Sequence, residues 1–247
     1  INDGRSICLC PSHKFGDRCL IEDHICRDHI NGTNTCLNGG RCIPHNHHHH
    51  HHPRSHKSFT CLCPKGYTGD RCHIRQTQII FSFDESSSLI IPESMLIHFI
   101  RYHHDHQHEN VTTIKSIPVN QEMITLYCSY PFHLVFIEFH HHQYYLAIMQ
   151  KTLVSSVNET VRKRVSSSDR CPHIGELFNH TLLSSHPLRR IKYYHQLCRH
   201  RPPSSPLSCF YDDDHLCVCD EFENGERHAN CFEFNHEMKL DCMGQNG

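Results

Sequence analysis

The sequence predicts one or more small disulfide-rich modules, followed by an antiparallel β domain and a cysteine-rich C-terminal region with short helices. Three observations support this fold class. The 17 cysteines of the 247-residue chain cluster toward its two ends. Between the clusters, apolar and β-branched residues alternate with polar ones over short segments, as in half-buried strands. Near residue 175 the apolar spacing changes to one that favours helix.

The cysteines and four glycosylation motifs indicate an oxidising compartment. Cytosolic thiols are kept reduced and exposed ones are reactive, so 17 cysteines favour secretion. The N-glycosylation acceptor pattern occurs at Asn31, Asn110, Asn158 and Asn179. We therefore expect an extracellular or cell-surface protein that passes through the secretory pathway.

Charge and hydropathy argue against two kinds of partner. The 24 basic and 26 acidic residues give a formal net charge of −2, and no block of Lys and Arg is long enough to predict nucleic-acid binding. The apolar stretches are too short and too interrupted to predict a membrane span. The chain begins without a Met or a signal-peptide pattern, so we expect it to be part of a longer extracellular chain whose anchor, if present, lies outside it.

Residues 22–73 contain six cysteines interleaved with glycine turns. The stretches CLNGGRC and CPKGYTGDRC place glycines where a tight turn needs positive φ. In cysteine order, in the Asn-Gly-Gly turn and in the Gly-Tyr-Thr-Gly ending, this segment resembles an epidermal growth factor-like (EGF-like) domain. Six cysteines alone allow many connectivities. The resemblance implies three of the bridges: Cys26–Cys42, Cys36–Cys61 and Cys63–Cys72.

Residues 1–20 repeat the closing half of the same pattern. The stretch CLCPSHKFGDRC ends in Phe-Gly-Asp-Arg-Cys, where the later copy ends in Thr-Gly-Asp-Arg-Cys. We expect Cys10 to pair with Cys19, and Cys8 to have its partner upstream of Ile1 in a tandem array. Modules this small bury too little apolar area to fold without bridges, each of which contributes about 2–4 kcal/mol.

The sequence predicts no cofactor and no dedicated metal site. Calcium-binding EGF-like domains carry oxygen ligands before the first cysteine. Here Glu22 and Asp23 fit that pattern but His24 and Ile25 do not, which favours a copy without calcium. The run His47–His52 lies in a hairpin loop that tolerates insertions. It can bind zinc or nickel adventitiously, but nothing fixes the three or four ligands of a true site.

Residues 76–165 are predicted to form an antiparallel β domain, possibly a sandwich. Six segments have the alternation and the flanking breakers of short strands: residues 77–83, 94–102, 111–119, 122–130, 132–139 and 144–149. The tract HHDHQHE (His103 to Glu109) lacks the helical spacing of a zinc-protease motif and is predicted to be a solvated loop. Cys128 is either a buried thiol, which we favour, or the partner of Cys171. The basic VRKR (161–164) is interpreted as a solvated linker or a dibasic processing site.

Residues 166–247 are predicted to hold one or two short helices, interrupted near Pro187, and a divergent cysteine-rich module. If Cys171 opens an EGF-like unit, Cys242 opens a further one. The family rule then implies three bridges: Cys171–Cys209, Cys198–Cys217 and Cys219–Cys231. A zinc ribbon is the alternative, but its spacing fits poorly and the glycosylation motifs favour oxidation.

As a whole, the chain is similar to large invertebrate surface proteins in which EGF-like repeats alternate with cysteine-rich spacers, a resemblance carried by LRRIKYYHQLC and CFYDDDHLCVCDEF. It implies an interaction, adhesion or receptor-ectodomain segment that binds a protein or glycan at the cell surface. Arg41, Tyr67 and Arg71 are candidate contact residues.

The alternative is a histidine-rich metal-binding or pH-responsive protein. Full protonation of the 29 histidines would raise the formal charge from −2 to +27. We find no nucleophile elbow, phosphate loop, paired carboxylates or ordered zinc motif, and therefore expect no enzyme.

Overall fold

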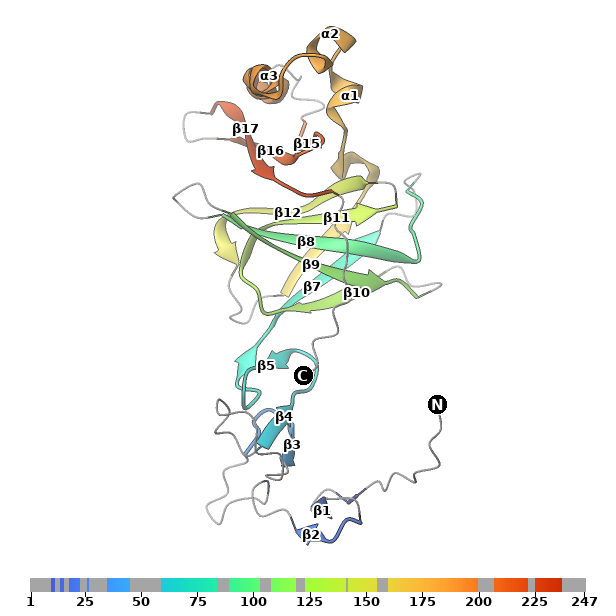
Figure 1. Cartoon of the computed structure of the whole chain (residues 1–247), viewed down its shortest axis with the longest axis vertical. Coiled ribbons are helices and arrows are strands. Elements are labelled where there is room, and N and C mark those ends of the chain that lie inside the picture. Colours follow the sequence, from blue (N-terminus) through green and yellow to red (C-terminus); the bar gives the residue numbers. More distant parts are fainter. Residues whose placement is uncertain are drawn as a thin grey trace. The chain divides into compact units, whose positions relative to one another are not determined.

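The structure is a computed structural model in which the chain divides into two compact units (Figure 1). The first comprises Ile1–Ile79, Leu126–Ser129 and Ser155–Val161. The second comprises Ile80–Thr125, Tyr130–Val154 and Arg162–Gly247. The described residues are 10–11, 14–15, 18–22, 26, 35–44, 59–83, 89–102, 108–118, 123–140, 142–154, 160–199, 207–221 and 225–236. Over these ranges the chain is mostly antiparallel β structure with a few short helices and seven disulfides.

Short strand pairs and disulfides make up the N-terminal part of the first unit. The pairs are β1 (Lys14–Phe15) with β2 (Ile21–Glu22), β3 (Arg41–Pro44) with β4 (Phe59–Leu62), and β5 (Tyr67–Thr68) with β6 (Ile74–Arg75). The bridges are Cys10–Cys19, Cys26–Cys42, Cys36–Cys61 and Cys63–Cys72. The last three are the pairings that the EGF-like resemblance implies, and Cys10–Cys19 is the bridge expected from the repeated closing pattern. Cys8 lies outside the described residues.

The Asn-Gly-Gly turn packs against the last cysteine of this module. The Asn38 side chain donates a hydrogen bond to the Cys72 carbonyl at 2.8 Å. A Cβ added to Gly40 would lie 2.6 Å from Cys72 Sγ, so this contact requires glycine. The Arg71 guanidinium Nε donates to the Thr35 carbonyl at 2.7 Å. Arg71, expected to contact partners, therefore has a structural contact within its own module.

A five-stranded antiparallel sheet is the centre of the second unit. Its order is β14-β12-β11-β8-β9. The strands are β8 (Ser94–Tyr102), β9 (His108–Ser116), β11 (Phe132–Phe139), β12 (Gln143–Val154) and β14 (Arg170–Cys171). Every residue of β11 is buried, as its nearly continuous apolar sequence FHLVFIEF predicts for a strand covered on both faces. β9 lies at an edge and is mostly exposed.

A second sheet has the order β10-β7-β13, formed by β7 (Thr77–Phe83), β10 (Met123–Cys128) and β13 (Thr160–Val165). The ring of Phe83 lies 6.2 Å from that of Phe139 at the end of β11, so both aromatic side chains are buried between strands of the two sheets. The basic 161–164 segment belongs to β13, and Lys163 pairs with Asp169 at 2.8 Å. The linker interpretation of this segment is therefore wrong.

The C-terminal region packs onto the five-stranded sheet. Strands β15 (Cys209–Tyr211), β16 (His215–Glu221) and β17 (Arg227–Glu233) form a sheet in that order. One face shares an apolar cluster with the central sheet, whose members include Ile100, Leu134, Phe136, Leu216, Val218, Phe232 and Phe234. The other face packs against the helices (Figure 1). Residues 166–247 therefore share a core with the β domain.

The helical segment contains η1 (Ser167–Asp169), α1 (Ile174–Leu177), α2 (His180–Leu183) and α3 (Pro187–Arg199). Pro187 begins α3, where its missing N–H leaves no helical bond unmade. Tyr194 and Cys198, four residues apart, are buried against the C-terminal sheet. No helix in the described ranges is long and apolar enough to cross a membrane.

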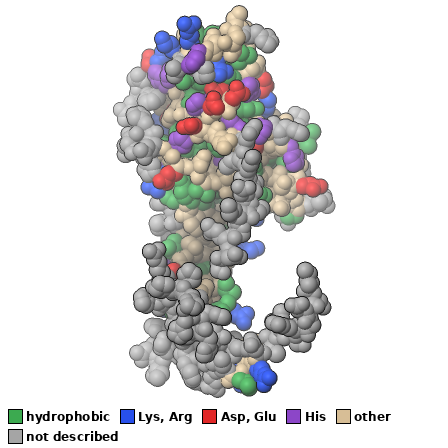
Figure 2. Space-filling model, in the orientation of Figure 1, with side chains coloured by type: hydrophobic (Ala, Val, Ile, Leu, Met, Phe, Trp, Pro, Cys, Tyr) green, Lys and Arg blue, Asp and Glu red, His purple; other side chains and the backbone are tan. Residues whose placement is uncertain are grey.

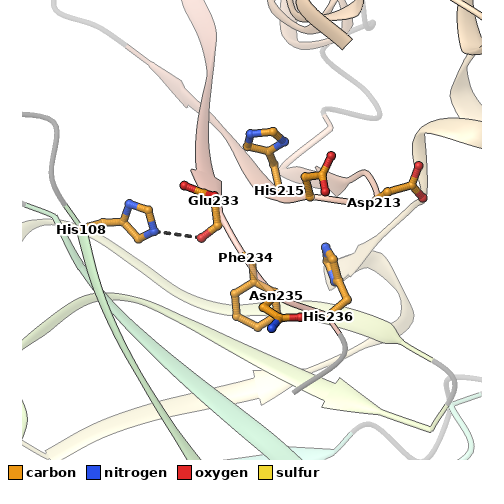
Figure 3. Close-up of a pocket in the computed structure, with 8 residues that line it drawn as sticks. His108, Asp213, His215, Glu233, Phe234, Asn235 and His236 are labelled. Carbon is orange, nitrogen blue, oxygen red and sulfur yellow. Dashed lines mark hydrogen bonds between the residues drawn. The ribbon is translucent and has the colours of Figure 1, made fainter. Parts of the chain in front are cut away.

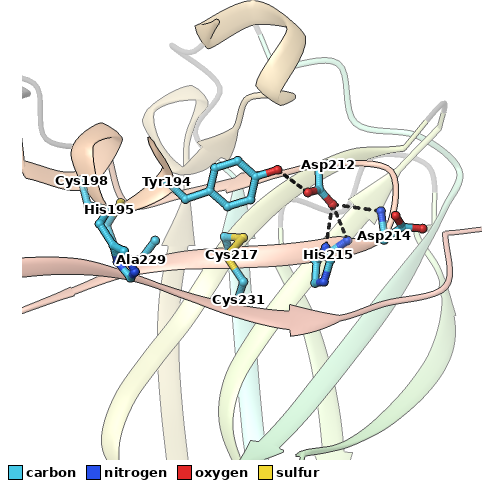
Figure 4. The surroundings of a disulfide bond; sticks show 10 residues. Tyr194, His195, Cys198, Asp212, Asp214, His215, Cys217, Ala229 and Cys231 are labelled. Carbon is cyan, nitrogen blue, oxygen red and sulfur yellow. Dashed lines mark hydrogen bonds and ion pairs between the residues drawn. A yellow bond between two sulfur atoms is a disulfide. The ribbon is translucent and has the colours of Figure 1, made fainter. Parts of the chain in front are cut away.

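The C-terminal disulfides differ in part from the expected ones. Cys171–Cys209 is present, but Cys198 pairs with Cys219, and Cys217 pairs with Cys231 (Figure 4). The physical reason is strand register, because Cys217 and Cys231 lie directly opposite on β16 and β17.

This pairing settles two further expectations for the cysteines. Cys128 is a buried thiol outside the disulfides, and the Cys171–Cys209 bridge rules out a Cys128–Cys171 pair. The zinc-ribbon alternative is also contradicted, since the thiols of CVC are oxidised. Cys242 lies outside the described residues.

Candidate functional site

A pocket of about 850 Å³ opens where β17 ends (Figure 3). Three segments line it: the start of β9, the turn between β15 and β16, and the residues from Glu233 to His236. The His108 ring lies 2.9 Å from the Glu233 carbonyl, and the Phe234 N–H donates to the Asp214 carbonyl at 2.7 Å. The wall is therefore held by contacts between its own segments.

Asp212 fixes the β15–β16 turn that supplies one wall. Its carboxylate accepts hydrogen bonds from the backbone N–H groups of Asp214 (2.9 Å) and His215 (2.7 Å) and from the Tyr194 hydroxyl, and it contacts the His215 ring at 3.0 Å (Figure 4). Burial alone would raise the pKa of Asp212, but these hydrogen bonds outweigh it and hold the pKa below its ordinary value. The turn is therefore built around a buried carboxylate that stays charged.

His236 closes the pocket near the central sheet. Its Nδ1 lies 2.8 Å from the hydroxyl of Tyr144 on β12, and its ring packs edge-on against Phe234 at 5.1 Å. Burial lowers the pKa of His236, and the nearby His142 lowers it further. Burial likewise raises the pKa of Tyr144 strongly, assisted by the charge of Glu138. Tyr144 and His236 are therefore most stable with both side chains neutral.

A buried carboxylate with two imidazole partners lies on the adjacent strands. His98 on β8 is fully buried, with Nε2 2.8 Å from Glu138 and Nδ1 2.9 Å from the Thr112 hydroxyl. The other oxygen of Glu138 lies 3.0 Å from His142 Nδ1, and half of the His142 side chain is exposed. This chain of contacts connects a buried histidine to solvent.

The pocket is lined by both carboxylates and imidazoles. Its carboxylates are Asp213, Asp214 and Glu233, and its imidazoles are His108, His215 and His236. The three carboxylates give the lining a negative field that favours a cationic group. In the part of the chain that is described, no group of three ligand-type side chains is arranged for a metal ion.

The candidate residues named from the sequence lie in different parts of the structure. Arg41 is exposed and Tyr67 half-buried in the N-terminal module. Asn110 is exposed on the edge strand β9, and Asn179 is exposed before α2, where its side-chain oxygen accepts a hydrogen bond from Thr181 at 2.9 Å. His108 and Glu109, which end the tract expected to be a solvated loop, instead begin strand β9, so that part of the prediction is wrong. The remaining candidates, Asn31, Asn158, the run His47–His52 and residues 103–107, lie outside the described residues.

Sequence reasoning missed the residues that build the site. His98 and Glu138 each interrupt an apolar strand sequence, in MLIHFI and VFIEF. A titratable residue at the centre of such a run must find a polar partner when buried, and this signal could have identified the pair. His236 and Asp212 carry no comparable signal, because their contacts depend on how the C-terminal sheet packs.

No known protein-family model matches the chain, and no solved structure matches it at a significant level.

Proposed function

We propose that this chain is an extracellular interaction segment built on EGF-like repeats, which binds protein or glycan partners at the cell surface. The seven disulfides support an extracellular or secreted location. The pairing of Cys26, Cys36 and Cys63 with Cys42, Cys61 and Cys72 supports EGF-like identity.

A repeated local geometry also supports a tandem array. The bridges Cys10–Cys19 and Cys63–Cys72 each span nine residues, with Cα atoms 5.2 Å apart. The closing cysteine has positive φ in both copies, 54° at Cys19 and 57° at Cys72. Two segments with the same closing motif and the same left-handed conformation at the closing cysteine favour a repeated module.

The observation that carries the binding proposal is the pocket at the end of β17. It is large enough for several side chains of a partner, and its wall is held by the buried Asp212 and by the Cys217–Cys231 bridge. A pre-formed surface costs little ordering on binding. Its carboxylates favour a partner that presents a basic side chain.

Binding of the secreted protein to intact cells tests this proposal. We expect saturable binding that is absent after reduction and alkylation of the protein. The variant D213N/E233Q removes two exposed pocket carboxylates and is expected to bind about tenfold more weakly. The control E93Q/E221Q removes two exposed carboxylates elsewhere in the same unit and should bind normally. Absence of saturable binding across a panel of cell types would contradict the proposal.

A pH-responsive role is the second candidate, favoured by the His98–Glu138–His142 contacts and by the pair Tyr144–His236. These contacts join β8, β11 and β12 to the segment after β17. Protonation of His236 places a charge in a site that favours the neutral ring. The pH dependence of stability tests this candidate separately from binding.

A further inference from the structure

Helix α3 is rich in cations and contains no acidic residue of its own. Its sequence, PLRRIKYYHQLCR, contains four Arg or Lys residues and no Asp or Glu. Arg199 pairs with Glu226 at 3.2 Å. Arg189 and Lys192 are exposed and make no ion pair with any described residue. Within the described part of the chain, Arg189 and Lys192 therefore present positive charge to solvent without an acidic partner.

The cations in the first turn do not stabilise the helix. The N-terminal end of a helix is the positive end of its dipole, so Arg189 and Arg190 in the first turn are electrostatically unfavourable there. No acidic residue lies in that turn to offset them. Arg190 is half-buried, and its Nε is buried without a hydrogen-bond partner. The dipole therefore gives no reason for a cation at the exposed Arg189, whose charge is available to an external partner.

The exposed cations share one face. Arg189, Lys192 and Arg199 are separated by three and seven residues, which places them along the same side of the helix. From Arg189 to Arg199 the row is about 15 Å long. Tyr193, 37% exposed, lies beside it. Figure 2 shows Lys and Arg side chains gathered at the top of this view, in the region of α3.

The opposite face of the helix is already occupied. Tyr194 and Cys198 are buried against the C-terminal sheet, and Cys198 is bonded to Cys219 of β16. A helix that lies on a membrane inserts its apolar face. Here that face is committed to the core and fixed by a disulfide, which leaves a linear row of charge for an extended anionic partner.

We propose that the exposed face of α3, formed by Arg189, Lys192, Tyr193 and Arg199, docks a sulfated polysaccharide chain. A repeating polyanion matches a row of cations better than a single phosphate does, and an extracellular partner fits the oxidised cysteines. This inference rests on the proposed extracellular function and assigns its glycan partner to α3, apart from the acidic pocket at the end of β17.

Binding of the secreted protein to heparin fragments of defined length is the test. We expect the Kd to rise about tenfold in R189Q/K192Q and binding to weaken steeply with salt. The control K65Q/R162Q removes the same charge from exposed positions elsewhere and should change the Kd less than twofold. E226Q removes the acidic partner of Arg199 and should tighten binding. Thermal unfolding temperatures equal to that of the unmodified chain would show that the variants are folded.

Three results would overturn the docking proposal: equal weakening by the control, undiminished binding to desulfated heparin, or binding to anionic phospholipid vesicles without binding to heparin. The pocket variant D213N/E233Q should keep its affinity for heparin. If the unmodified chain binds no cells, the proposed function fails. If it binds cells equally well with R189Q/K192Q and shows no heparin affinity, only the α3 inference fails.

Discussion

The Tyr144 hydroxyl and the Nδ1 of His236 lie 2.8 Å apart, and this contact joins β12 to the segment that follows β17. Tyr144 is fully buried. Burial lowers the pKa of His236, and His142 lowers it further, while Glu138 and Asp212 act in the opposite direction. Because the net direction is downward, the folded protein binds a proton at His236 less readily than the unfolded chain does.

Stability should therefore fall on acidification. The contribution of His236 is fully present above the unfolded histidine pKa of about 6.5 and is lost as the pH falls toward the lower folded value. We expect thermal unfolding to move to lower temperature between pH 7.5 and pH 5, by less in His236→Gln than in the unmodified chain. His73→Gln removes an exposed histidine and serves as the control. An unchanged pH dependence in His236→Gln would show that another group is responsible.

Asp212 and Tyr194 should be energetically coupled, because their buried side chains share a hydrogen bond. Asp212→Asn weakens several hydrogen bonds at once, and we expect a loss on the order of 2 kcal/mol in the free energy of unfolding. Tyr194→Phe removes one of them and should cost about 1 kcal/mol.

Urea unfolding of both single variants and of the double variant at neutral pH measures the coupling. The double variant should lose less than the sum of the two single losses. Strict additivity would mean that the hydrogen bond adds nothing to stability. The low pKa of Asp212 implies a further effect, since its contribution to stability should disappear as the pH falls below about 3.8.

Disulfide mapping should find Cys198–Cys219 and Cys217–Cys231. Val218 alone separates Cys217 from Cys219, so ordinary digestion leaves both in one peptide, and stepwise reduction with differential alkylation is required. Replacing Cys217 and Cys231 together by Ser should preserve the other bridge and cost about 2–4 kcal/mol. Recovery of Cys198–Cys217 would instead indicate the EGF-like pairing and a different register of β16.

Asn110 should carry a glycan, because its side chain is exposed on the edge strand β9. The third residue of the motif, Thr112, also contacts His98 at 2.9 Å, so the two roles can be separated. Asn110→Gln should remove the glycan alone. Thr112→Val should remove both the glycan and the hydrogen bond, with a further loss of about 1 kcal/mol. Thr112→Ser should keep both.

Mass spectrometry of the intact protein and urea unfolding after enzymatic deglycosylation provide the two measurements. An unglycosylated Asn110 in protein secreted by eukaryotic cells would refute the first expectation. A bulky glycan at this edge would also keep β9 from pairing with another chain. Asn110→Gln should therefore aggregate at lower protein concentration than the glycosylated chain.

Local pattern predicted the strands well. Residues 77–83, 94–102 and 132–139 were expected as strands and have those bounds in the structure. Their apolar alternation or continuous apolar run reports burial directly. Strand β13 was not predicted, because its Arg and Lys residues are typical of a solvated linker. Its alternating exposure shows a strand with only one buried face.

Long-range packing could not be predicted from the sequence. The bridges of the N-terminal module follow a family pattern, whereas those of residues 198–231 follow from the register of β16 and β17 and from the position of α3 over them. The pocket and the partners of Glu138 depend on the same packing. Only the titratable residues within MLIHFI and VFIEF indicated a buried polar contact.

The double burial of β11 has a consequence for biosynthesis. Leu134 and Phe136 are covered by Leu216 and Phe232, which lie roughly a hundred residues later in the chain. At typical synthesis rates of about 5–20 residues per second, that apolar surface stays uncovered for roughly 5–20 seconds as the chain emerges. During this interval the nascent protein exposes an apolar strand that favours aggregation, and the Cys217–Cys231 bridge can form only after the covering sheet has been synthesised.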